Sequence, residues 1–461
     1  MAGFVALPAY IRSMTEIRQP AVAGLFYPAD AGGLQAALSG HVGASPWPID
    51  AKAIIAPHAG YVYSGPIAGT AYAALAHRAG QVRRVVLLGP AHRLGFRGIA
   101  LPTARGFATP LGVVPVDHDA LADLADLPEV MVLDRAFDQE HALEVHLPFL
   151  QHVFPGFALV PLVVGDASAT AVEAALERLW GGPETLIVIS SDLSHYESYD
   201  AARQRDAATS KLIEVHRADA LHGQLACGCR AIAGLLRRAA ALDLRATTLD
   251  LRSSGDTAGD RQRVVGYGAY SFEYAEQARL PDAYRAQLRD AVRQVLDQTA
   301  RKAEIKVVPD SFAPALLAAR RTFVTLRRPD GQLRGCAGSL EEGEPLVVNV
   351  LKSTIRSAAA DPRFTPVTPE EAAALDIGIS IMSHDREIVV DSESALIDSL
   401  RPGKDGLIIK DGPHQALFLP QVWESLPNPR AFVHQLKIKA GLAGTHWSPT
   451  FRAWRFTTES F

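Results

Sequence analysis

The sequence predicts a large α/β domain followed by a smaller α+β domain, and three observations support this prediction. The chain has 461 residues, more than one hydrophobic core usually serves, so two or three domains are expected. Up to Phe272, short apolar runs alternate with alanine-rich helical stretches, which is typical of βαβ units around a parallel or mixed sheet. Beyond Pro281 this alternation gives way to a mixture of hairpin and helix signals.

Hydrophobic periodicity places the elements of the first domain. Short β-branched runs that Gly, Pro or Ser closes predict strands buried on both faces. Alanine-rich stretches between them predict helices. The strands are expected at 53–56, 85–89, 186–190 and 264–272, and the helices at 67–76, 169–179 and 200–215.

A polar segment, 273–282, separates the two predicted domains, which are 14–273 and 283–461. The second domain opens with an amphipathic helix, because apolar residues recur at helical spacing from Tyr284 to Leu296. A turn at Pro329-Asp330-Gly331 predicts a hairpin. Its strands are expected at 322–326 and 332–336, followed by a helix from Glu344-Pro345, strands at 377–381 and 406–409, and a helix at 432–440.

Composition argues against several classes of protein. A net charge of -4 and a pI near 6.4 give no reason to expect nucleic-acid binding. Three cysteines form no disulfide framework and fit a reducing cytosol. No apolar stretch reaches the roughly 18 residues that span a bilayer. Residues 1–12 make a poor signal peptide, with Met14 as an alternative start, so we expect a cytoplasmic protein that binds no membrane.

Three apolar runs in the first domain lead to histidines: His58, His92 and His195. The carboxyl ends of strands in open α/β sheets line the ligand crevice. Three imidazoles at that edge therefore indicate a metal site or a proton-transfer site. Neutral imidazoles at positions 58 and 92 would suit iron, copper or zinc, and the alternative is that each histidine caps a loop by hydrogen bonding.

Asp192 precedes His195 by three residues. A carboxylate there would orient the imidazole and raise its basicity, as in a general base. The alternative is that Ser191 or Asp192 caps the next helix.

Four ionisable groups lie within seven residues from Glu140 to His146. On a helix, Glu140 and Glu144 would share a face, with His141 three residues before Glu144. Such spacing occurs in helical metal sites, but a solvated helix face is the alternative.

Two cysteine motifs complete the candidates. Cys227-Gly228-Cys229 could ligate a soft or borderline metal, or supply small buried apolar side chains. In Leu333–Ser339, Arg334 could lower the thiol pKa of Cys336 while the glycines admit a ligand to the backbone. A tight glycine bend with a buried cysteine is the alternative there.

With these residues in view, the chain resembles a fusion of two families. Residues 20–272 resemble the Memo family, protein B of the AmmeMemoRadiSam system, and residues 280–461 are similar to the AMMECR family, protein A of that system. The Memo motifs are Gly24-Leu25-Phe26-Tyr27-Pro28, Ala56-Pro57-His58-Ala59-Gly60-Tyr61, Gly65-Pro66, Gly89-Pro90-Ala91-His92, Glu140-His141, His146-Leu147-Pro148-Phe149, Ser190-Ser191-Asp192-Leu193-Ser194-His195 and Cys227-Gly228. The AMMECR motifs are Leu333-Arg334-Gly335-Cys336-Ala337-Gly338, Asp361-Pro362-Arg363-Phe364 and Phe418-Leu419-Pro420.

The resemblance to Memo proteins implies the fold of class III extradiol dioxygenases, the LigB type, with helices flanking the sheet. It implies an iron or copper site at His58, His92 and Cys227, with His195 at the position of the acid/base histidine. The family commonly has proline four residues after this cysteine, where this chain has Ala231, and Cys229 is an additional thiol. The system's third member, a radical S-adenosylmethionine protein, is the implied partner.

Together these observations predict a metal-dependent oxidoreductase-like domain fused to an AMMECR module, acting on an unidentified small molecule or protein. His58, His92 and Cys227 would bind the metal, and Asp192 and His195 would handle protons. The remaining candidates, which would orient the ligands or contact substrate, are Glu140, His141, His146 and Cys229. The competing hypothesis is a non-catalytic scaffold that binds a peptide or small ligand. A third hypothesis treats Cys336, within the Arg334, Gly335, Cys336 and Gly338 motif, as a nucleophile.

Overall fold

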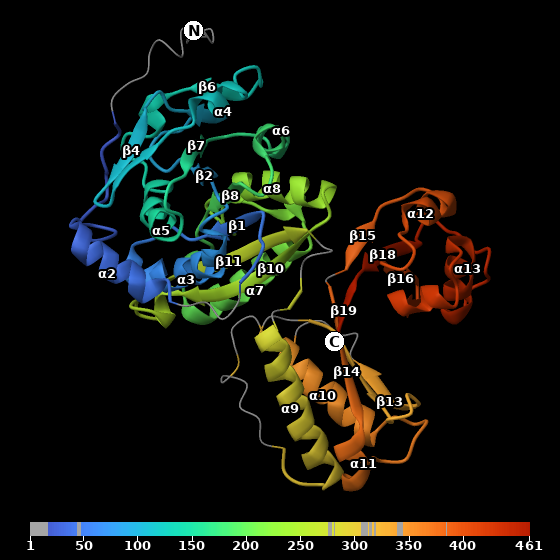
Figure 1. Ribbon diagram of the computed structural model, residues 1–461. Helices are drawn as coiled ribbons and strands as arrows, with labels where there is room; N and C mark the ends of the chain where they lie inside the picture. Colours follow the sequence, from blue (N-terminus) through green and yellow to red (C-terminus); the bar gives the residue numbers. More distant parts are fainter. Residues whose placement is uncertain are drawn as a thin grey trace. The chain divides into compact units, whose positions relative to one another are not determined.

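The computed structural model divides into two compact units, Met1–Ala278 and Arg279–Phe461. It describes residues 17–43, 48–274, 279–280, 282–305, 312, 316–317, 320–338, 344–383 and 385–461. The segment predicted to carry the alternative start, together with Pro281 and Ser339, lies outside the described residues. Figure 1 shows the helices and strands of both units along the chain.

The N-terminal unit is built around a mixed sheet with the strand order β10-β11-β1-β8-β2-β7-β3-β6, and β9 pairs with β11. Its central strands β1, β8, β2 and β7 run parallel, whereas β11 is antiparallel to β1. This arrangement confirms the predicted α/β class. The strands are β1 (Ala53–Ala56), β2 (Arg84–Pro90), β3 (Ile99–Leu101), β6 (Val130–Val132), β7 (Ala158–Val164), β8 (Thr185–Ser190), β9 (His195–Glu197), β10 (Leu244–Ser253) and β11 (Val264–Tyr274), with a separate β4 (Gly106–Thr109) and β5 (Gly112–Pro115) hairpin.

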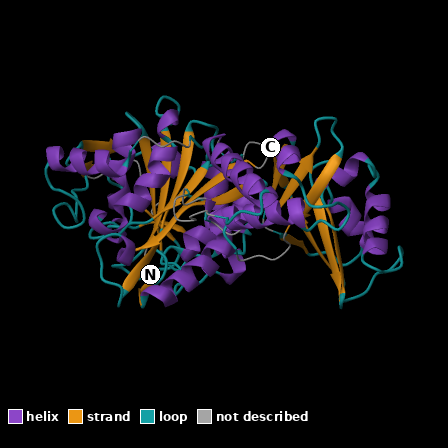
Figure 2. Cartoon of the chain, turned by 90° about the horizontal axis from the view of Figure 1, so that it is seen from below, coloured by secondary structure: helices purple, strands orange, loops and turns teal. Residues whose placement is uncertain are grey.

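Helices lie on both faces of this sheet, as the two views in Figures 1 and 2 show. Helix α8 packs on α6 and on β2, while α3 packs on β10, β11 and β1. The helices are α2 (Ala31–His41), α3 (Tyr61–Ala74), α4 (His118–Ala122), α5 (Leu147–Val153), α6 (Ala169–Leu179), α7 (Tyr199–Glu214) and α8 (Cys229–Ala241). Short 3₁₀ turns are η2 (Ala76–Arg78), η3 (Asp134–Ala136), η4 (Glu144–His146), η5 (Ala218–Ala220) and η6 (Ser254–Asp256).

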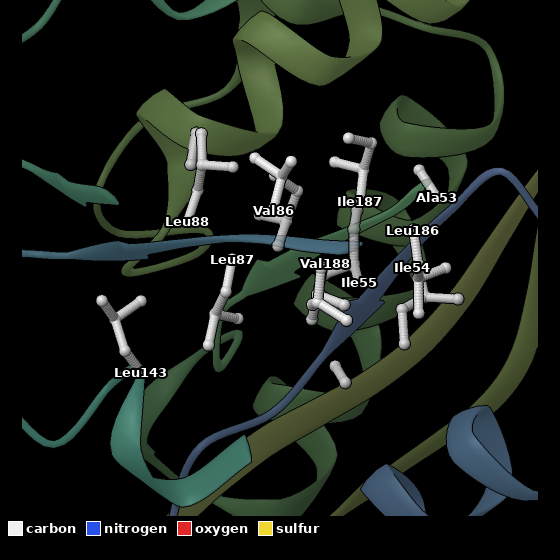
Figure 3. Packing of buried hydrophobic residues seen from close by; sticks show 14 of the residues in the cluster. Ala53, Ile54, Ile55, Val86, Leu87, Leu88, Leu143, Leu186, Ile187 and Val188 are labelled. Atoms are coloured by element: carbon white, nitrogen blue, oxygen red, sulfur yellow. The ribbon is translucent and has the colours of Figure 1, made fainter. Parts of the chain in front are cut away.

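The central strands form the core because their side chains are buried on both faces. Ile54, Val86 and Ile187 each have 0% of their surface exposed, and the close view in Figure 3 shows them with their neighbours on β1, β2 and β8. Strands that helices cover on both sides need such near-continuous apolar runs. These three parallel strands therefore end at one edge of the sheet.

Most predicted elements of this unit are present, with two differences. Helix α3 begins at Tyr61 instead of Ile67 and runs through Pro66, so the loop after β1 leads directly into a helix. The third apolar run ends as a strand at Ser190, and His195 lies in the separate short strand β9. The expectation that His195 sits directly at a strand end of the parallel sheet is therefore wrong.

The C-terminal unit contains two four-stranded antiparallel sheets, β13-β12-β14-β19 and β15-β18-β16-β17. This mixture of sheets and helices confirms the α+β prediction. Its strands are β12 (Thr322–Arg327), β13 (Leu333–Gly338), β14 (Asp376–Met382), β15 (Arg386–Ile388), β16 (Gly406–Asp411), β17 (His414–Phe418), β18 (Arg452–Phe456) and β19 (Thr458–Ser460). Its helices are α9 (Asp282–Ala300), α10 (Leu346–Ala359), α11 (Pro369–Ala374), α12 (Glu393–Ser399) and α13 (Pro429–Lys439), with the 3₁₀ turn η9 (Pro420–Glu424).

Helix α10 packs on α9 and on the β12–β13 hairpin, while α13 packs on β17 and α12. The rings of Trp423 and Phe432 stack with centroids 3.8 Å apart in the core beside α13. Among the described residues, no helix is both long and apolar enough to cross a membrane.

Candidate metal centre

The ends of neighbouring parallel strands bring His58 and His92 together. His58 follows β1 after one residue, and His92 follows β2 after one residue. Strand β8 lies between these two strands and pairs with both in parallel. The two imidazole rings consequently lie with their centroids 5.1 Å apart, at the sheet edge that the sequence predicts.

A third imidazole comes from the turn that precedes η4. The ring of His141 stacks on that of His92, with centroids 4.8 Å apart, and lies 5.5 Å from the ring of His58. One nitrogen of each of the three histidines lies within 4.8 Å of the other two. Three imidazoles at this spacing can hold one transition-metal ion.

Hydrogen bonds determine which nitrogen of His58 is free for an ion. Ser190 Oγ donates to the carbonyl of Ala142 at 2.6 Å, so its contact of 2.6 Å with His58 Nδ1 requires the imidazole to donate. His58 therefore carries its proton on Nδ1, and its Nε2 is the unprotonated nitrogen, with the Cys227 sulfur beside it. Such a partner behind a ligating histidine fixes its tautomer and its orientation.

Glu140 does the same for His92. Its Oε1 accepts from His92 Nδ1 at 2.9 Å, and its Oε2 accepts from the backbone N–H of His92 at 2.6 Å. The N–H groups of His141 and Ala142 also donate to Oε1, each at 3.0 Å. Burial alone would raise the pKa of Glu140, but the hydrogen bond and charge of His92 together with these amides lower it to about 2. Glu140 is therefore a carboxylate that leaves Nε2 of His92 free.

The protonation of His58 and His141 also suits metal binding. Burial, and then the neighbouring charges of His92 and His141, lower the pKa of His58 well below its usual value. Burial lowers the pKa of His141 as well. Neutral imidazoles offer the lone pairs that a metal ion requires.

Cys227 lies beside this group of three. Its Sγ is 3.5 Å from Nε2 of His58 and accepts the backbone N–H of Asp192 at 3.2 Å. Burial, and then the charge of Asp192, raise the pKa of the thiol. The sequence predicts His58, His92 and Cys227 as the metal ligands. In the structure, the three side chains whose ligand atoms lie close together are His58, His92 and His141. Metal binding by Cys227 stays a prediction, with Cys227 adjacent to one ligand.

Asp192 and His195 share no hydrogen bond, although the charge of His195 acts on the carboxyl group of Asp192. Asp192 is buried, and its Oδ1 accepts the backbone N–H of His58 at 2.8 Å. His195 is exposed, and its Nδ1 contacts the carbonyl of Leu193 at 2.8 Å. The orienting partner of His195 is thus a backbone carbonyl. The helix-cap alternative is also wrong, because Ser198 is the N-cap of α7.

The stretch from Glu140 to His146 is a turn followed by the 3₁₀ turn η4, not one helix, so Glu140 and Glu144 do not share a helix face. His146 is completely buried, and its Nδ1 contacts the hydroxyl of Tyr72 at 2.8 Å. Burial lowers its pKa to about 3. This histidine therefore has no exposed surface that a substrate could contact.

Cys229 is the first residue of α8 and lines a cavity of about 610 Å³. The same cavity reaches Cys227 and Pro90-Ala91, the residues directly before His92. The two cysteines thus have different places: Cys227 contacts His58, while Cys229 belongs to the wall of the neighbouring cavity.

The cysteine motif of the C-terminal unit has structural partners. Arg334 forms an ion pair with Glu371 at 2.8 Å, and the backbone N–H of Cys336 donates to Asp361 at 2.9 Å. Gly335 is approached by the backbone of α10 at Ser357. These contacts favour the structural interpretation of the motif.

Sequence reasoning missed two residues of the centre. It assigned no role to Ser190, although this residue ends β8 at the same edge as the histidines. It also missed Glu144, which accepts a hydrogen bond from Arg18, the side chain that donates to the carbonyl of Glu140 beside His141. The signal for Ser190 was a hydroxyl at the strand end between two histidine-bearing strands.

Two family models match this chain, one within each of its two units. Residues 18–271 match the family described as Memo-like protein, and residues 288–461 match AMMECR1. A MEMO1 family protein of Thermoplasma volcanium is 32% identical over 266 residues, which cover 55% of this chain and 97% of that protein. A MEMO1 family protein of Nitrosopumilus maritimus is 32% identical over 200 residues, covering 41% of this chain and 73% of that protein.

Among solved structures, an uncharacterised protein from Pyrococcus horikoshii is 30% identical with a TM-score of 0.36, covering 39% of this chain and 90% of that one. The Memo match covers more than half of the chain and confirms the resemblance drawn from the motifs. The chain belongs to the Memo-like protein family and carries an AMMECR1 domain after its Memo domain.

Proposed function

We propose that the Memo domain binds iron or copper through His58, His92 and His141 and acts as a metal-dependent redox protein. The observation that carries this proposal is the convergence of three imidazoles, two of which have their Nε2 lone pairs freed by Ser190 and Glu140. Fusion to an AMMECR1 domain supports a shared process for the two domains. We place that process in the AmmeMemoRadiSam system, with a radical S-adenosylmethionine protein as partner.

The residues present fit a transition-metal ion. Imidazole suits iron, copper and zinc, and three protein ligands leave positions open for water or substrate. Nδ1 of His141 is buried and has no hydrogen-bond partner, although it lies 3.4 Å from Glu140 Oε1. A buried nitrogen without a partner is the kind of atom that a bound metal ion would satisfy. A bound iron or copper ion would supply one-electron redox chemistry.

The surrounding residues have separate tasks. The Cys227 thiol, next to His58, offers a soft fourth donor once deprotonated. His195 is exposed with its Nδ1 bonded to a carbonyl, so its Nε2 can exchange protons with solvent or substrate. The cavity at Cys229 offers room for a small substrate beside the centre.

Metal analysis tests the proposal directly. The full-length protein, purified without added metal, is expected to retain iron or copper by mass spectrometry. His58→Ala, His92→Ala and His141→Ala should each weaken binding by about tenfold or more, because each removes one of three ligands. His77→Ala is the matched control, since this exposed histidine pairs with Asp50 away from the centre. Unchanged metal content in all three variants would reject the site.

Glu140→Gln is expected to weaken metal binding by about 10–100-fold without removing a ligand, because the uncharged amide orients His92 less firmly. Affinity is measured by competition with a chelator of known strength. The control is Glu177→Gln, whose carboxylate is 62% exposed and pairs with Arg238. Equal affinities for the Glu140 and Glu177 variants would show that the carboxylate does not support the centre.

A further inference from the structure

A second cavity lies in the C-terminal unit, far along the chain from the histidines. It has a volume of about 580 Å³, within the range of small-molecule sites. Strands of both sheets and the start of η9 contribute to it. The described residues that line it supply an apolar wall and one cation: Phe323, Leu417, Phe418, Leu419, Val422 and Lys439.

The apolar wall is incompletely covered by protein. Phe323, Leu417 and Leu419 are partly buried and pack around a small core of Met382, Ile408 and Phe456. Apolar side chains that remain partly exposed around a cavity gain free energy when an apolar ligand removes them from water. The cavity therefore favours a hydrocarbon group.

The cysteine motif of the C-terminal unit, Leu333–Ser339, contributes Gly338 to one wall of this cavity. Gly338 pairs with Phe323 across β12 and β13. A Cβ atom at Gly338 would lie 2.4 Å from Cδ1 of Phe323, so only glycine lets this ring lie over the neighbouring strand. This close contact explains why the motif Leu333–Ser339 has glycine at position 338, a residue with no part in the metal centre.

Lys439 places a positive charge at the rim. Its Nζ donates to the carbonyl of Leu417 at 3.0 Å and lies 5.1 Å from the ring centroid of Phe418. Among the described carboxylates, none forms an ion pair with it. An ammonium has three N–H donors, so two remain for an external acceptor.

We propose that this cavity binds a medium-chain monocarboxylate, with its hydrocarbon tail against Phe323 and Val422 and its carboxylate on Lys439. Among the described residues that line the cavity, Lys439 is the one cation, which matches a ligand with one negative charge, whereas a phosphate would call for more charged donors. Besides Lys439 the lining has two polar side chains, Gln421 and Ser425, and is otherwise apolar, which favours a hydrocarbon tail over a sugar or a nucleotide. This site is independent of the metal centre and gives the AMMECR1 domain a ligand of its own.

Calorimetric titration of the full-length protein with decanoate and with 1-decanol tests this assignment. Saturable decanoate binding is expected, tighter than binding of the uncharged alcohol. Lys439→Gln should weaken decanoate binding about tenfold, the value of a charged hydrogen bond, and leave decanol binding unchanged. Lys410→Gln is the control, because Lys410 is an exposed lysine of β16 outside the cavity.

A second variant examines the tail. Val422→Asn should weaken binding of decanoate and of decanol alike, because it places an amide against the hydrocarbon. Val422 is only partly buried, so the substitution is compatible with folding. The proposal is overturned if decanoate does not bind saturably, if Lys439→Gln leaves its affinity unchanged, or if decanol binds as tightly as decanoate.

Discussion

Replacing Glu144 with alanine is expected to cost about 3–5 kcal/mol of stability, because it removes the acceptor for a buried charge. Glu144 is completely buried, and its Oε2 accepts from Arg18 Nη1 at 2.8 Å and from the backbone N–H of Ala21 at 2.7 Å. Its Oε1 accepts from the N–H of Val22 at 2.9 Å and from the hydroxyl of Tyr27 at 2.7 Å. The variant leaves all four donors without this acceptor.

The effect should reach the metal centre through Arg18. This side chain also donates to the carbonyls of Phe137 and Glu140, each at 2.7 Å, and so ties the start of the described chain to the turn that carries His141. We therefore expect faster hydrogen exchange in residues 18–27 and 137–146, together with weaker metal binding. Both follow from one lost carboxylate.

Denaturant unfolding and hydrogen exchange of the full-length protein measure these changes. Glu177→Ala is the control, since it removes an exposed carboxylate and should change stability by less than about 1 kcal/mol. The exchange data assign any loss to the Memo domain, because the two units need not unfold together. Equal unfolding midpoints and exchange rates in the two variants would contradict the role given to Glu144.

The parts of this protein that follow local rules were predictable from its sequence. Strands β1, β2 and β8 are apolar runs that Pro or Ser closes, and burial on both faces demands that composition. Because their carboxyl ends share an edge, the proximity of His58 and His92 followed from the same pattern. Helix α6 also coincides with its predicted range, 169–179. Its boundaries follow local rules as well, because Ser168 caps its start and its apolar residues recur at helical spacing.

The parts that depend on distant contacts were not predictable. The turn of His141 is held by Glu144, whose partners lie more than a hundred residues earlier. Helical spacing in that stretch suggested a shared face, but these contacts favour a turn and η4. Likewise, His195 was expected to pair with Asp192, whereas the pairing of β9 with β11 directs its Nδ1 to Leu193. Neither long-range pairing leaves a periodic signal in the sequence.

The motif Leu333–Ser339 shows the same limit in the C-terminal unit. The hairpin around Pro329-Asp330-Gly331 was predictable from turn chemistry, and β12 and β13 confirm it. The segment that packs against Gly335 was not predictable. It is the backbone of α10 at Ser357, more than twenty residues further along the chain. A glycine admits a ligand and a helix equally well, so the sequence could not distinguish them.

Gly335→Ala is expected to destabilise the AMMECR1 domain by about 1–3 kcal/mol, as overpacking of a close contact does. A Cβ atom at Gly335 would lie 2.1 Å from the carbonyl oxygen of Ser357, so the backbone of α10 would have to move. That helix is tied to the sheet, since Ser357 Oγ donates to the carbonyl of Val324 at 2.8 Å. The strain therefore falls on the packing between α10 and the β12–β13 hairpin.

Gly378→Ala provides the matched comparison, because Gly378 lies in β14 of the same sheet and its added Cβ would come no closer than 3.8 Å to Thr325 O. Calorimetry of both full-length variants should show a lower melting temperature for Gly335→Ala alone. Hydrogen exchange should rise in α10. If the two variants melt together, helix packing does not require the glycine at 335.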